Sequence, residues 1–134
     1  MIGSQEVEQI CEDEGFEMQP YQDHLGVWTI GHGLTFLTEE ESRFIVEHFR
    51  VPAMEKELHK ALPWVQHCHP EVQRVLINMA YNLGVPRLLG FNNTLKAAKE
   101  QDHAQMALEM RDSRWYRQVT NRAERLCKRI EALI

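Results

Sequence analysis

The chain has 134 residues, of which 43% are hydrophobic and 26% charged, and its net charge is −5. This length suits a single domain that folds without a disulfide or a structural metal. The acidic balance gives no electrostatic support to a nucleic-acid partner or to any other anionic polymer. No apolar run approaches the roughly 20 residues of a membrane span, and residues 1–8 do not resemble a signal peptide. We therefore expect no nucleic-acid partner, no stable membrane association and accumulation in the cytoplasm.

The cysteines, Cys11, Cys68 and Cys127, are odd in number and far apart, which favours reduced, mostly buried thiols over a disulfide framework. His67 and His69 flank the second cysteine, but no fourth ligand stands at a recognisable zinc spacing. The sequence therefore predicts no metal site.

The N-terminal part begins with a predicted helix, for which Ser4 is a suitable N-cap and Gly15 a suitable left-handed terminator. Its apolar residues recur three or four positions apart. Residues 16–35 are rich in glycine, proline, aromatic and β-branched residues, a composition typical of short strands and turns.

From Thr38 onward the pattern is helical, and Thr38 with Glu41 forms a capping box. The strongest apolar stripe predicts a central buried helix that starts at Pro70 and stops at Gly84. We expect an α+β fold in one domain, 1–134. A small β-hairpin subdomain (about 15–36) would lie beside a mainly α-helical lobe (about 37–134) that also includes the N-terminal helix.

Glu14 stands in the last turn of the first predicted helix. The negative end of the helix dipole disfavours a second negative charge there and pushes a carboxyl toward its protonated form, which a general acid requires. The alternative is a solvated helix-end glutamate, and the neighbouring Glu12, Asp13 and Glu17 keep that interpretation.

Asp23 and Thr29 follow on the two arms of a predicted hairpin. If residues 24–26 form a three-residue loop, Asp23 pairs with Val27 and Tyr21 with Thr29, so the carboxylate and the hydroxyl share one face. They could then hold one water between them. A four-residue loop would break this parity, and each residue alone is more often a turn-capping aspartate or an ordinary strand threonine.

A proton donor, a base and a water-steering hydroxyl are what an inverting glycosidase needs, with about 6.5–9.5 Å between the carboxyls. The motif from Glu14-Gly15 through Tyr21-x-Asp23-x-x-Gly26 to Trp28-Thr29-Ile30-Gly31-x-Gly33-x-Thr35 resembles the phage-type lysozymes, the muramidases of the T-even phage kind. Three later segments, residues 76–84, 90–95 and 113–123, resemble further motifs of this family and occur in the same order. The resemblance covers about residues 5–130.

This resemblance implies a lysozyme-like fold and cleavage, without a cofactor, of the β-1,4 bond between N-acetylmuramic acid and N-acetylglucosamine in peptidoglycan. It makes Glu14 the general acid, Asp23 the group that activates or positions water, and Thr29 the second anchor of that water. It also implies that Arg122 lies near Glu14 and orients it by an ion pair. From its own context Arg122 would be a surface arginine at a helix start.

Three further residues are predicted to bind or orient the substrate. The same resemblance implies that Asn82 and Phe91 line the cleft, although Phe91 could equally pack in the core. His32 falls between two glycines near the cleft, where a titratable group could shift the pH optimum, or it is an exposed strand residue.

The expected setting is lysis of a bacterial host at the end of a phage cycle. The enzyme would stay in the host cytoplasm until a holin-type lesion releases it to the periplasm and wall. We expect a monomer, because packing the helices together should leave no exposed apolar stripe. The alternatives are a non-catalytic lysozyme-like module that binds peptidoglycan, against which the three intact positions argue, and a chitinase-like hydrolase.

Overall fold

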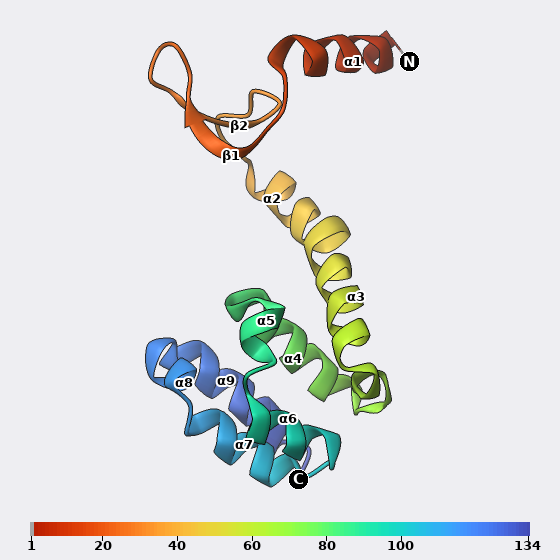
Figure 1. Ribbon diagram of the computed structural model, residues 1–134, viewed down its shortest axis with the longest axis vertical. Helices are drawn as coiled ribbons and strands as arrows, with labels where there is room; N and C mark the ends of the chain where they lie inside the picture. The colour runs from red at the N-terminus through yellow and green to blue at the C-terminus, as the bar shows by residue number, and fades with distance from the viewer. Residues whose placement is uncertain (1) are drawn as a thin grey trace. The chain divides into compact units, whose positions relative to one another are not determined.

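The structure, a computed structural model, describes residues 2–134 (Figure 1). It contains a two-stranded antiparallel sheet near the N-terminus and is otherwise mainly helical, so the predicted α+β class is confirmed. The chain divides into two compact units. We call the part up to Ile45 the N-terminal unit and Val46–Ile134 the C-terminal unit, and each is described by itself.

The N-terminal unit opens with helix α1, Ile2–Glu14, followed by strands β1, Glu17–Gln22, and β2, Trp28–Gly31. Gly15 ends α1 as predicted, because its φ of 69° suits glycine and its N–H bonds to the carbonyl of Cys11. The prediction of Ser4 as the N-cap is wrong, because α1 already includes Ile2. A helix start shifts easily by one or two residues, since the first N–H groups have no intrahelical partner in any case.

The hairpin has the predicted register. Tyr21 pairs with Thr29, and the N–H of Asp23 donates to the carbonyl of Val27 at 2.9 Å, which closes a three-residue loop. The ladder is irregular between Glu17 and Tyr21, where Pro20 has no N–H to donate. The parity on which the shared face of Asp23 and Thr29 depends is therefore present.

Helix α2, Glu39–Ile45, completes this unit. Its capping box is confirmed in both directions. The N–H of Glu41 donates to the hydroxyl of Thr38 at 3.2 Å, and the N–H of Thr38 donates to the Glu41 carboxylate at 2.9 Å. These bonds lower the pKa of Glu41, the bond from the Thr38 backbone most of all.

The C-terminal unit consists of helices joined by short connections. In order, these are π-helix η1 (Val46–Arg50), α3 (Val51–Ala61), 3₁₀-helix η2 (Pro63–His67), α4 (Pro70–Leu83), α5 (Val85–Leu88), α6 (Asn92–Lys99), α7 (His103–Arg111), α8 (Arg114–Gln118) and α9 (Thr120–Glu131). Helix α4 begins at Pro70 and is terminated by its C-cap Gly84, as predicted. The N–H of Gly84 bonds to the carbonyl of Ala80, and its φ is 84°.

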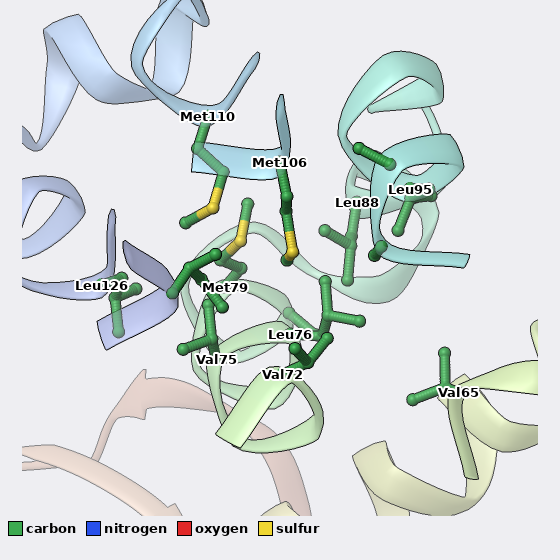
Figure 2. Packing of buried hydrophobic residues seen from close by; sticks show 14 of the residues in the cluster. Val65, Val72, Val75, Leu76, Met79, Leu88, Leu95, Met106, Met110 and Leu126 are labelled. Carbon is green, nitrogen blue, oxygen red and sulfur yellow. The ribbon is translucent and has the colours of Figure 1, made fainter. Parts of the chain in front are cut away.

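The hydrophobic core of the C-terminal unit is built around α4. Its buried residues face methionines of α7 and leucines of α5, α6 and α9 (Figure 2). The residues that Figure 2 labels around α4 are Val72, Val75, Leu76, Met79, Leu88, Leu95, Met106, Met110 and Leu126. Cys68 and Cys127 are buried as predicted, and burial raises the pKa of the Cys127 thiol to about 11.

Large apolar side chains in the N-terminal unit remain exposed, in contrast to that core. On α1, Val7 and Ile10 are both more than half exposed, and Trp28 on β2 is 61% exposed. The N-terminal unit by itself therefore leaves the predicted apolar face of α1 uncovered, because helical periodicity marks a face without showing what covers it. Among the described residues, no helix is long and apolar enough to cross a membrane.

Candidate active site

Glu14 is the last residue of α1, and its side chain lies directly over the backbone of Gly33. A Cβ built on Gly33 would stand 2.6 Å from Glu14 Oε2 and 2.8 Å from its Cδ, which is closer than real atoms approach. Gly33 also has a φ of 75°, in the left-handed region. The predicted acid is thus packed against a position that only glycine fills without displacing it.

Glu14, Asp23 and Thr29 line one cavity of about 540 Å³ within the N-terminal unit. The remaining lining residues are Tyr21, Gln22, His24, Gly33 and Thr35. The structure therefore brings the three predicted catalytic residues together from the end of α1 and the two arms of the hairpin. Gly33 and Tyr21 line the cavity but were not predicted as site residues. The sequence feature that pointed to Gly33 is its close spacing to Gly31, and the one that pointed to Tyr21 is its predicted pairing with Thr29.

Asp23 is held as a carboxylate by its own loop. Its Oδ1 accepts hydrogen bonds from the N–H groups of Leu25 at 2.8 Å and Val27 at 2.9 Å. The bond from Val27 is the main cause of a pKa below the ordinary range. Asp23 therefore does cap the turn. Because both bonds use Oδ1, the lone pairs of Oδ2 face no competition from this loop.

Thr29 is the buried polar residue of the site, with 6% of its surface exposed. Its hydroxyl donates to the carbonyl of Val27 at 3.0 Å. A threonine hydroxyl has one proton to donate and two lone pairs that accept. With its proton committed to Val27, Thr29 presents an acceptor, the group that would orient a water by one of the water's protons.

His32 is exposed and is not among the residues that line the cavity. Its Nδ1 is 2.8 Å from the carbonyl oxygen of Gly15, and its ring contacts the ring of Phe16. The alternative of an exposed strand residue is right about exposure but wrong about the strand, because β2 ends at Gly31 and His32 lies in the turn that follows. Its two contacts involve the residues that follow Glu14.

Arg122, Asn82 and Phe91 lie in the C-terminal unit, where each has a local partner. Arg122 donates from Nε to the side-chain oxygen of Asn78 at 2.9 Å, and Asn82 accepts from the indole N–H of Trp115 at 2.8 Å. Phe91 packs edge-on to Trp115 and lines a separate cavity of about 390 Å³. Their predicted roles toward Glu14 and the substrate stay predictions.

The sequence is also similar to those of known proteins. A model of the phage lysozyme family matches residues 11–132. The chain belongs to the phage lysozyme family. It is also similar to a protein of Dictyostelium discoideum named "Probable T4-type lysozyme 1", with 26% identity over 151 aligned positions that cover 89% of each chain. The family match confirms the predicted family, and the helical structure with its N-terminal hairpin is the expected lysozyme-like α+β fold. Membership among the phage lysozymes supports a lysozyme-like hydrolase with peptidoglycan as its substrate.

Proposed function

We propose that this phage lysozyme is an endolysin that hydrolyses the β-1,4 bond between N-acetylmuramic acid and N-acetylglucosamine. The observation that carries the proposal is the single cavity lined by Glu14, Asp23 and Thr29. Two carboxylates and a water-positioning group around one cleft are the parts of an inverting glycosidase.

In the proposed reaction, Glu14 gives its proton to the glycosidic oxygen as the bond from that oxygen to the anomeric carbon breaks. A water attacks the anomeric carbon from the opposite face and passes a proton to Asp23. The lowered pKa of Asp23 keeps its side chain ionised, so it presents a carboxylate to the water. Thr29, already donating to Val27, accepts a hydrogen bond from the same water and fixes its direction. No cofactor takes part.

We further propose that the enzyme acts in host lysis at the end of a phage cycle. It would reach the periplasm and wall from the host cytoplasm through a holin-type lesion, and would act as a monomer. The motifs that suggested an endolysin support this setting.

The experiment that tests the function compares wild type, Glu14→Gln and Glu12→Gln on purified peptidoglycan and on chitin, with release of reducing ends as the readout. Glu14→Gln keeps the shape but cannot protonate the leaving oxygen, so its rate should fall by at least about 100-fold. Glu12→Gln makes the same chemical change on the same helix and should keep wild-type activity.

Three other results would each contradict the proposal. Wild-type activity in Glu14→Gln would refute the acid assignment. Binding of peptidoglycan without any product from the wild type would favour a binding module. Product from chitin alone would favour a chitinase-like hydrolase.

A further inference from the structure

A tight turn between β2 and the following loop carries His32 at its apex. Ile30 and Leu34 exchange both backbone hydrogen bonds, at 2.8 and 2.9 Å, so only Gly31, His32 and Gly33 form the turn. Both glycines have positive φ, 64° and 75°. Such a turn reverses the chain within three residues and projects the one side chain that it holds.

The His32 side chain reaches back to the end of α1. Its Nδ1 lies 2.8 Å from the carbonyl oxygen of Gly15, and because a carbonyl only accepts, Nδ1 must carry the proton. Its ring lies 5.2 Å from the Phe16 ring, tilted by 47°. The residue after the predicted acid is thus held by a hydrogen bond, and the next residue by a ring contact.

The same turn also supports the acid itself, because the Glu14 carboxyl lies over Gly33. The end of α1 and the turn therefore meet at two places, one on each side of the bond between Glu14 and Gly15. We propose that His32 is a positioning residue that holds the end of α1 on this turn and so fixes the Glu14 carboxyl in the cavity. This inference rests on the proposed function.

Packing within the N-terminal unit itself gives this segment little support. Glu14, Gly15 and Phe16 are all exposed, and Thr29 is the buried residue among those described in this unit. The last turn of a helix frays readily, because its final carbonyls have no intrahelical partner. A histidine side chain near a helix C-terminus can also hydrogen-bond one of its last carbonyls. The bond from His32 therefore supplies order that a hydrophobic core supplies elsewhere.

Two substitutions separate the donor from the ring. His32→Phe keeps a ring against Phe16 but removes the donor. His32→Asn removes the ring but keeps an N–H close to the position of Nδ1. Displacement of a catalytic group by about 1 Å can cost about 100-fold in rate. We therefore expect His32→Phe to lower kcat about 10- to 100-fold on soluble peptidoglycan fragments, with KM changed less than about threefold. His32→Asn should recover most of kcat, and His67→Phe, an exposed site in the C-terminal unit, should match wild type.

A wild-type kcat in His32→Phe would overturn the inference, whether KM stays the same or rises. The same assay includes Glu14→Gln. If that variant is inactive while His32→Phe is normal, the proposed function stands and only the role of His32 fails.

A measurement on the wild type avoids any effect of a variant on folding. Long-range ¹H–¹⁵N NMR at pH about 8.5, where an ordinary imidazole is neutral, distinguishes the two tautomers. The Nδ1–H tautomer is expected for His32 because that nitrogen donates to Gly15. An Nε2–H tautomer would overturn the inference, whatever the activity of the enzyme.

Discussion

The two units differ in what holds them together. Every buried hydrophobic side chain among the described residues lies at Leu58 or beyond, in the C-terminal unit. The N-terminal unit instead relies on a capping box, hairpin loops and the bond from His32 to Gly15. The predicted chemistry therefore sits on the unit with the least packing. The geometry of the predicted active site depends on single hydrogen bonds. Single substitutions in the N-terminal unit should therefore disturb this geometry more than they lower the stability of the protein.

The units also differ in charge. The N-terminal unit holds ten of the twenty acidic side chains and one of the fifteen basic ones, a net charge of −9. The C-terminal unit holds the other ten acidic and fourteen basic side chains, a net charge of +4. The total of −5 suggested no electrostatic support for an anionic polymer. That conclusion holds for one unit, whereas the other has the sign that attracts an anionic wall.

The largest effect on stability should come from the core of the C-terminal unit. Leu76 is fully buried on α4, and Leu76→Ala should lower the free energy of unfolding by about 2–5 kcal/mol. Met18→Ala, at a 74% exposed position of the N-terminal unit, should change it by less than about 0.5 kcal/mol. Urea unfolding measures both values. Equal losses would show that the contrast in packing is false.

A second test compares one glycine from each unit. Gly33 and Gly84 have φ values of 75° and 84°, so alanine strains both backbones by about 1–3 kcal/mol. Only at Gly33 does the new Cβ meet the Glu14 carboxyl. Gly33→Ala should therefore lower kcat about 100-fold, whereas Gly84→Ala should leave the activity of the folded protein unchanged. Similar kcat values for the two variants would show that the contact with Glu14 is unimportant.

Thr29 tests whether a buried group in the N-terminal unit serves rate rather than stability. Removing its hydroxyl loses one bond to the proposed water, so Thr29→Ala should lower kcat about tenfold. The free energy of unfolding should fall by no more than about 1 kcal/mol, for the lost bond to Val27. Thr29→Ser, which keeps the hydroxyl, should restore most of the rate. A lower melting temperature with normal kcat would mean an ordinary strand threonine.

The smallest effect concerns acid stability in the C-terminal unit, where Arg111 bridges Glu124 at 2.8 Å and Glu131 at 2.6 Å. The bond from Arg111 is the main cause that lowers the pKa of Glu124 to about 2, and it lowers that of Glu131 as well. A lowered folded-state pKa stabilises the protein above the ordinary range near 4.5, and this contribution is lost as pH falls toward 2.

Arg111→Met should therefore be less stable than wild type at pH 7, and the difference should shrink as the pH falls from about 4.5 to 2. Because the three side chains are partly exposed, the difference should be small. Urea unfolding at several pH values measures it. A difference that grows on acidification would contradict the assigned pKa directions.

Much of the local structure could be predicted from the sequence, because neighbouring residues decide it. The capping box of Thr38 and Glu41, the ends of α4 at Pro70 and Gly84, and the three-residue hairpin loop all follow from side-chain and backbone chemistry within a few positions. Two features could not be predicted in this way. The start of α1 depends on weak preferences, and periodicity could not show that the faces of Val7 and Ile10 stay exposed.

The residues proposed for the chemistry, Glu14, Asp23 and Thr29, and the register of the hairpin could all be predicted from the sequence. The contact between Glu14 and Gly33 and the bond between His32 and Gly15 could not, and they are known from the three-dimensional structure. These contacts join residues that touch in space but lie far apart in sequence, 17 positions apart for His32 and Gly15. No local rule places such groups together, because their meeting depends on the summed directions of every turn between them.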